Sequence, residues 1–106
     1  MSKDEVQSIA CQIVAYAGSA FDYFNHAVEA AENGQPEAVA EFMKQGQNEL
    51  RLAHEAQTSL LAAEAGQQDI PFSIIMVHAQ DHLTMAIFAE RMAKHFIALW
   101  KRGNVI

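Results

Sequence analysis

Two short breaks divide this chain of 106 residues into three segments of similar length. The first break is Asn33-Gly34, and glycine ends a helix at little cost because it readily adopts the left-handed backbone conformation. Pro36 follows at a position where proline commonly opens a helix. The second break covers residues 66–71, which read GQQDIP. Between the breaks, apolar residues recur at helical spacing, so the sequence predicts three long helices.

We expect these helices over residues 4–32, 36–65 and 72–101. Short connections between helices of similar length favour an antiparallel up-down-up three-helix bundle, an all-α fold with a single domain over residues 1–106. Gly46 does not fit the pattern, because a glycine inside a helix costs up to about 1 kcal/mol relative to alanine. The predicted packing positions are Val6, Ile9, Ile13, Ala17, Ala20, Phe24, Val28 and Ala31 in the first helix and Val39, Phe42, Met43, Leu50, Ala53, Ala56, Leu60 and Leu61 in the second.

Composition and charge argue against several classes of function. With 7 basic and 13 acidic residues, the formal net charge is −6, which disfavours nucleic acid or an anionic membrane as the main partner. No apolar run reaches the length of a membrane span and the first residues do not resemble a signal peptide, so direct membrane insertion is not expected. The single cysteine, Cys11, excludes an intramolecular disulfide, fits a reducing cytoplasm and is expected to be a small core residue.

The stretch most suggestive of chemistry opens the third predicted helix, where residues 77–83 read VHAQDHL. Positions i, i+3 and i+4 of a helix share a face, so His78, Asp81 and His82 are predicted to point in the same direction. Titratable groups on an apolar packing face lose solvation unless they are paired, neutralised or coordinated, so this cluster predicts a functional site. The apolar residues that continue this face are Met85, Ala89, Met92, Ala93, Phe96, Leu99 and Trp100.

The apolar arc of the third helix is wider than contact with two neighbouring helices requires. A single bundle would therefore leave an apolar stripe exposed to water. We expect a homo-oligomer with the third helices near the symmetry axis, most simply a cyclic assembly.

The motif at residues 78–83, HAQDHL, resembles the signature of the lactose/cellobiose-type enzyme IIA component of the bacterial phosphoenolpyruvate-dependent sugar phosphotransferase system. The likeness covers almost the whole chain, with weaker matches in the family's order. It departs at residues 19–22, which read SAFD where the family usually has DARS, and at Thr84-Met85, where the usual order is reversed. The weaker matches are residues 13–18 (IVAYAG), 53–58 (AHEAQT), 71–73 (PFS) and 101–103 (KRG).

This resemblance implies a cytoplasmic phosphotransferase in which His78 accepts a phosphoryl group from HPr. The group then passes to a cysteine of enzyme IIB, for uptake of a β-galactoside or β-glucoside such as lactose or cellobiose. The resemblance also implies a homotrimer, a nine-helix assembly, with Asp81 binding one divalent metal on the threefold axis. Three carboxylates with waters suit Mg²⁺. His82 and Gln80 are implied as neighbours that support the active imidazole, although Gln80 points away by helical angle.

The residue types suit phosphoryl transfer, in which positioning and charge stabilisation dominate. The attacking nitrogen must be unprotonated, and an apolar surrounding disfavours the charged form of the His78 imidazole. His82 lies one turn away and can donate a hydrogen bond from a ring nitrogen to the phosphorylated product. The dipole of the helix adds up to about 1 kcal/mol near its N-terminus.

Two alternatives from other classes of function stay open. Histidines at i and i+4 are well spaced for metal binding, so His78, Asp81 and His82 are candidates for a zinc or iron site in a helical bundle. A di-iron bundle would also need Glu-x-x-His motifs on two helices, which the sequence lacks. The second alternative is a non-catalytic regulatory oligomer of the same fold. The remaining histidines, His26, His54 and His95, are expected to be solvated or packed rather than catalytic.

Overall fold

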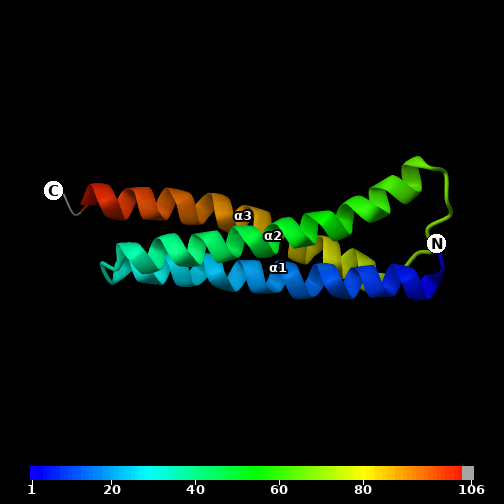
Figure 1. Ribbon diagram of the computed structural model, residues 1–106, viewed down its shortest axis with the longest axis horizontal. Helices are drawn as coiled ribbons and strands as arrows, with labels where there is room; N and C mark the ends of the chain where they lie inside the picture. Colours follow the sequence, from blue (N-terminus) through cyan, green and yellow to red (C-terminus); the bar gives the residue numbers. More distant parts are fainter. Residues whose placement is uncertain (104–106) are drawn as a thin grey trace.

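The computed structural model describes residues 1–103 and contains three α-helices of 30 residues each. They are α1 (Lys3–Glu32), α2 (Pro36–Ala65) and α3 (Ile74–Gly103), and they run up, down and up in a bundle of 56 × 19 × 19 Å (Figure 1). Residues 1–103 contain no strand, so the predicted all-α fold is confirmed. Residues 104–106 of the predicted domain lie outside the described range. Among the described residues, no helix combines the length and apolar character that a membrane span requires.

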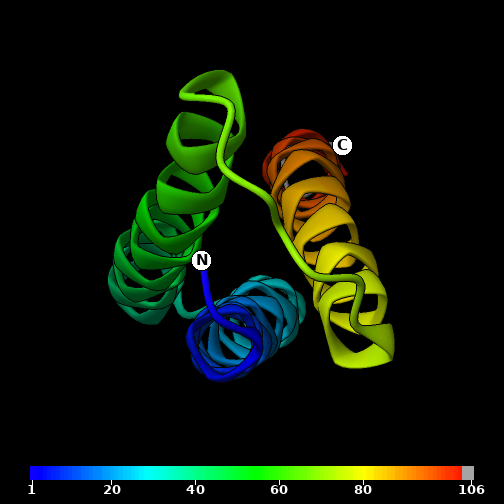
Figure 2. The ribbon, with the colours of Figure 1, turned by 90° about the vertical axis from the view of Figure 1, so that its right-hand side faces the viewer.

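Helix α1 is the centre of the bundle. It packs along both other helices, whereas α2 and α3 contact each other only slightly, and they lie on either side of α1 when the molecule is viewed along its length (Figure 2). Most of the buried residues of α1 are alanines, whose small side chains allow close approach of both neighbours. The buried residues of α1 are Val6, Ala10, Ile13, Ala17, Ala20, Phe24, Ala27 and Ala30.

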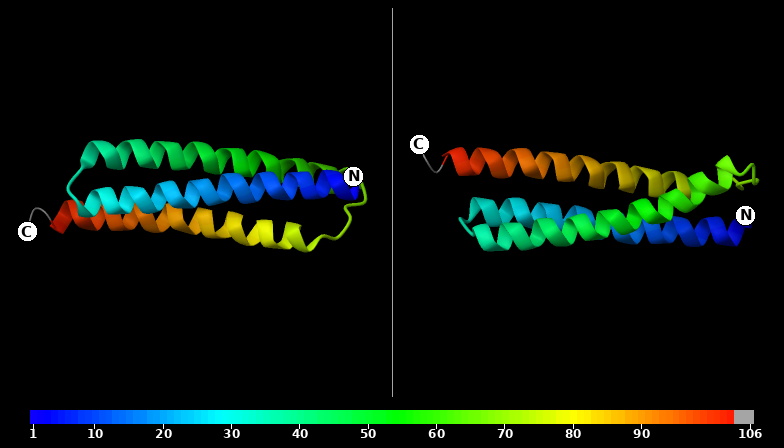
Figure 3. Two further views of the ribbon diagram at one scale, coloured as in Figure 1. Left: turned by 90° about the horizontal axis from the view of Figure 1, so that it is seen from below. Right: turned by 45° about the horizontal axis from the view of Figure 1, so that its top comes forward.

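The two connections lie at opposite ends of the bundle. The α1–α2 turn is at the end where α3 finishes, and the segment between α2 and α3 crosses the other end, next to the N-terminus (Figure 3). Toward this second end, α2 diverges from α1, and the segment between α2 and α3 connects the two helices across this end (Figure 1). The beginning of α3 therefore lies apart from the end of α2 (Figure 2).

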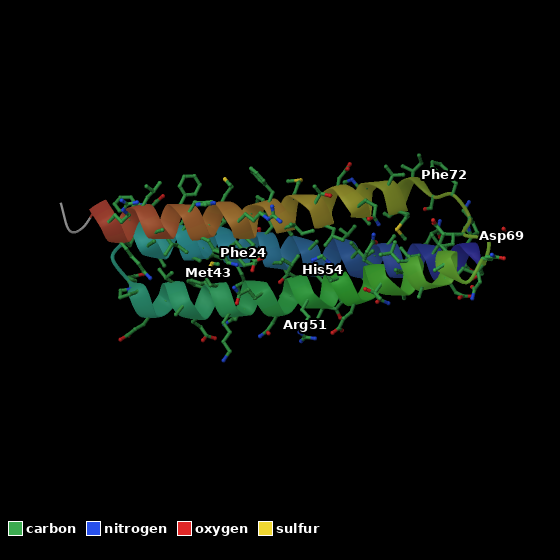
Figure 4. All side chains as sticks on the ribbon, turned by 90° about the horizontal axis from the view of Figure 1, so that it is seen from above. Phe24, Met43, Arg51, His54, Asp69 and Phe72 are labelled. Atoms are coloured by element: carbon green, nitrogen blue, oxygen red, sulfur yellow. The ribbon has the colours of Figure 1, made fainter. Side chains whose placement is uncertain are left out.

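Gly46 is explained by its contact with α1. A Cβ atom built on Gly46 would lie 2.6 Å from Cε1 of Phe24, closer than two carbon atoms can approach. The Phe24 side chain is only 1% exposed and fills the space between α1 and α2 (Figure 4). The missing side chain at Gly46 makes room for this ring, and burial of the ring offsets the poor helix propensity of glycine.

The helix starts follow local hydrogen-bonding rules. At α1, the Ser2 hydroxyl accepts a hydrogen bond from the Glu5 backbone N–H at 3.1 Å, and the Glu5 carboxylate accepts one from the Ser2 N–H at 3.4 Å, which is a capping box. Helix α3 begins at Ile74, two residues later than predicted. The Ser73 carbonyl accepts the first helical hydrogen bond, from the N–H of Val77 at 3.3 Å.

The ends of α1 and α2 use the same type of turn with different residues. Gly34 has a φ of 67°, and the N–H of Gln35 donates to the Ala30 carbonyl at 2.9 Å, as in a Schellman motif. Gln67 occupies the equivalent position after α2 with a φ of 62°. A residue that has a Cβ atom is sterically strained in this left-handed backbone conformation, so the turn that ends α2 has a higher conformational energy than the turn that ends α1.

Candidate functional site

Helix α3 has two apolar faces. One face is buried against the core and consists of Ala79, Leu83, Ala86, Ala93 and Ile97. The other face is largely exposed, and we call it the outer stripe; three of its members, Phe88, Met92 and Phe96, line a pocket together with residues of α1. Its spacing of three and four residues resembles the contact face of a coiled coil. The outer stripe consists of Ile74, His78, Asp81, Met85, Phe88, Met92, Phe96 and Leu99.

Within one chain, the prediction that the site residues lie on the packing face was wrong. His78 and Asp81 are exposed and His82 is half-buried. The face that packs against α1 is centred near Ala79, about 100° around the helix from His78 at 3.6 residues per turn. The prediction that a single bundle leaves an apolar stripe in water is confirmed, because Met85 is 52% exposed and its apolar neighbours along the outer stripe are also accessible.

The two histidines of the motif form a close pair. Nε2 of His78 lies 3.0 Å from Nε2 of His82, and the rings meet edge to face, with centroids 4.5 Å apart and planes at 81°. This is hydrogen-bonding distance, so one ring nitrogen donates and the other accepts. The i, i+4 spacing on a regular helix produces this arrangement, as the sequence predicted.

Gln80 contacts α2 and not the histidine pair. Its side-chain amide nitrogen donates to Oε1 of Gln57 at 2.9 Å and lies 3.3 Å from the sulfur of Met76. The bond joins the first half of α3 to α2 where these helices otherwise have few contacts. Gln57 had no predicted role because residues on different helices are not related by any local spacing rule.

Exposed apolar side chains surround the start of α3. Phe72 is 74% exposed and Ile74 is 73% exposed, and Val77 beside His78 is also accessible. Figure 4 places Phe72 at the end of the bundle, in the same segment as Asp69. A polar site beside exposed apolar residues is typical of surfaces that contact another protein.

The remaining candidates lie apart from the pair. Cys11 is exposed on α1, so its predicted position in the core was wrong. His26 is solvated, with Nδ1 3.7 Å from the Glu29 carboxylate and its ring 5.5 Å from that of Phe42. His54 and His95 are exposed on α2 and α3, as expected for residues outside the site.

No single-chain metal cluster is present in the described residues. Among residues 1–103, no group of three or more His, Cys, Asp or Glu side chains is arranged to hold an ion. A zinc or iron site made by His78, Asp81 and His82 of one chain is therefore not supported.

The fold and site together define an all-α bundle that presents a histidine pair and a carboxylate near the start of its third helix. The sequence matches the family described as the PTS system, lactose/cellobiose specific IIA subunit, over residues 8–101. The chain belongs to this family and is a component of a sugar phosphotransferase system.

Curated relatives and solved structures agree with this assignment. The lactose-specific EIIA component of Staphylococcus aureus (strain N315) is 42% identical over 103 residues, which is 97% of this chain and 100% of the relative. That of Lactococcus lactis subsp. lactis is 37% identical over 97% of this chain and 98% of the relative. The crystal structure of the cellobiose-specific enzyme IIA from Bacillus anthracis has a TM-score of 0.92 at 30% identity, covering 99% of this chain and 94% of that one.

Proposed function

We propose that this chain is the cytoplasmic phosphocarrier of a sugar-uptake phosphotransferase system. His78 accepts a phosphoryl group from phospho-HPr and passes it to the cysteine of enzyme IIB. The observation that carries this proposal is the exposed His78 imidazole, whose Nε2 faces a second imidazole at 3.0 Å near the start of a long helix. Membership of the family supports the same conclusion.

The geometry suits a nucleophilic imidazole. As the bond between phosphorus and the donor breaks, a nitrogen–phosphorus bond forms at His78, whose attacking nitrogen must be unprotonated. Because His82 lies one turn away, its ring N–H can move its hydrogen bond from the His78 nitrogen to an oxygen of the arriving phosphoryl group. His78 is exposed in the single chain and lies near one end of α3, where a protein partner can approach the ring.

The proposed sugar class follows from the relatives. Those at 37–42% identity are named as lactose-specific, and a solved structure at 30% identity is named as cellobiose-specific. We therefore propose that the system takes up a β-galactoside or a β-glucoside.

We further propose that three chains assemble through their outer stripes. The exposed apolar side chains of this stripe need a partner surface, and Asp81 lies among them. Three carboxylates meeting on an axis repel one another unless a cation neutralises them. One Mg²⁺ per trimer, held by one Asp81 from each chain, would supply this neutralisation.

The acceptor is tested by intact-mass spectrometry after incubation with phosphoenolpyruvate, enzyme I and HPr. We expect one acid-labile phosphoryl group per parent chain, none on His78→Ala, and an unchanged result for His95→Ala, which removes a remote histidine of the same helix. A folded parent that takes up no phosphoryl group would contradict the proposal and favour a non-catalytic regulatory oligomer.

The supporting role of His82 needs a rate measurement. We expect His82→Ala to accept and release the phosphoryl group more slowly, by about 10-fold or more, because the product loses a hydrogen-bond donor. Rapid-quench measurement with phospho-HPr and then with enzyme IIB gives the two rates. Unchanged rates in both directions would remove His82 from the mechanism.

The metal is tested through the assembly. A chelator is expected to weaken the oligomer of the parent protein, whereas Asp81→Leu, which removes the repelling carboxylates, should be insensitive to chelator. Sedimentation velocity with and without chelator measures the size of the oligomer for the parent and for Asp81→Leu. A parent oligomer that is indifferent to chelator would contradict the Mg²⁺ assignment.

A further inference from the structure

We propose that His78 and His82 also form a bidentate binding site for a divalent transition-metal ion of the nickel or copper type. This site is separate from the Mg²⁺ proposed at Asp81 and uses nitrogen instead of oxygen ligands. It lies within a single chain and needs no assembly.

The distance between the two nitrogens fits such an ion. Metal–imidazole bonds are about 2.0–2.1 Å long, so two cis ligands at 90° have their nitrogens about 2.9 Å apart, and two tetrahedral ligands about 3.3 Å apart. The observed separation of the two Nε2 atoms is 3.0 Å. Square-planar and octahedral ions such as Cu²⁺ and Ni²⁺ match this spacing better than tetrahedral Zn²⁺ does.

The surroundings of the pair favour a reversible site. In the single chain His78 is exposed and His82 is half-buried, so an ion can reach both rings from solvent. Among residues 1–103, no third His, Cys, Asp or Glu completes a ligand set with them, which leaves the other coordination positions to water. Mg²⁺ prefers oxygen ligands and is not expected to compete for this pair.

Occupancy of the site would prevent phosphoryl transfer, and this consequence rests on the proposed function. Both Nε2 atoms must be unprotonated to bind the ion, so the ring that donates in the hydrogen bond moves its proton to Nδ1. The ion then uses the His78 lone pair and leaves no Nε2–H on His82 to donate to the product. A bound ion therefore blocks the acceptor and its neighbour together. The system would become sensitive to excess transition metal at this component.

Binding is tested by calorimetric titration of the full chain with Ni²⁺ in excess Mg²⁺, which keeps oxygen sites occupied. We expect one Ni²⁺ per parent chain, and binding about 100-fold weaker in both His78→Ala and His82→Ala, because one tethered ligand is lost. His95→Ala is the matched control, since His95 has no histidine one turn away. Equal affinity in the parent and His82→Ala would overturn the proposal.

Inhibition is tested by adding Ni²⁺ to the parent and to His82→Ala during single-turnover transfer from phospho-HPr. We expect Ni²⁺ to slow the parent at least about 10-fold, to be reversed by chelator, and to change the His82→Ala rate little, because the chelate is absent. Equal inhibition of both proteins would overturn the consequence for transfer. A parent that binds Ni²⁺ through both histidines but never accepts phosphoryl groups supports the metal site and refutes the proposed function.

Discussion

At the scale of single residues, Gly46 determines how closely α1 and α2 approach. We expect Gly46→Ala to lower the free energy of unfolding by about 1–2 kcal/mol, because overpacking against the Phe24 ring exceeds the gain of roughly 1 kcal/mol in helix propensity. Urea unfolding at fixed protein concentration measures the change.

Gly18 provides the matched control, since it is also inside a helix but a Cβ there meets nothing within 4 Å in the chain. Gly18→Ala is expected to raise the free energy of unfolding by up to about 1 kcal/mol. A stabilising Gly46→Ala would show that the Phe24 ring moves aside easily, and the account of Gly46 would be wrong.

The hydrogen bond between Gln57 and Gln80 is a second residue-scale feature. We expect Gln57→Leu and Gln80→Leu each to lower the free energy of unfolding. The double variant should lower it by about 1 kcal/mol less than the sum of the two single changes, because the two side chains share one half-buried hydrogen bond. A double-mutant cycle from urea unfolding gives the coupling. If the effects of the two substitutions on the free energy of unfolding were strictly additive, they would contradict a stabilising hydrogen bond between Gln57 and Gln80.

At the scale of elements, the end of α2 contains avoidable strain at Gln67. Gln67→Gly is expected to raise the free energy of unfolding by about 1 kcal/mol, because glycine adopts a φ of 62° without steric cost. Thermal unfolding measures this gain. Gln68→Gly is the control, since no positive φ occurs there, and it should give no gain. Equal gains would mean that strain at Gln67 is not the cause.

Much at this scale could be predicted from the sequence. The stop at Gly34, the proline at position 36 and helical spacing of apolar residues placed the three helices to within one or two residues at each end. The histidine pair followed from spacing within one helix. The side of α3 that meets α1 could not be predicted, because hydrophobicity does not tell whether an apolar residue packs within its own chain or against another.

The same reason explains the error at Cys11, a small apolar side chain that the fold leaves exposed. It also explains why the link from Gln57 to Gln80 was not foreseen, since it depends on how α2 and α3 face each other. The roles proposed for His78, His82 and Asp81 rest on resemblance and chemistry, whereas the Gln80 side chain, expected to support the active imidazole, bonds to Gln57 on α2 instead.

At the scale of the whole molecule, the bundle is long and thin, and its apolar surface is unevenly distributed. Side chains project outward from α3 along the length of the helix (Figure 4), and the large apolar members of the outer stripe are exposed except Met92, which is half-buried. The histidine pair lies near one end of this stripe. An assembly through the outer stripe would therefore place three histidine pairs close to its axis at one end.

This arrangement is tested by placing a charge in the stripe. We expect Met85→Glu to reduce the molar mass in solution from that of a trimer to that of a single chain, because three added carboxylates would be buried near the axis without partners. Light scattering after size exclusion measures the mass. Leu61→Glu is the control, since Leu61 is 57% exposed on α2, compared with 52% for Met85 on α3. Because Leu61 lies outside the stripe, its variant should keep the mass of the parent. An intact trimer of Met85→Glu, or a parent that is a single chain, would exclude the outer stripe as the interface.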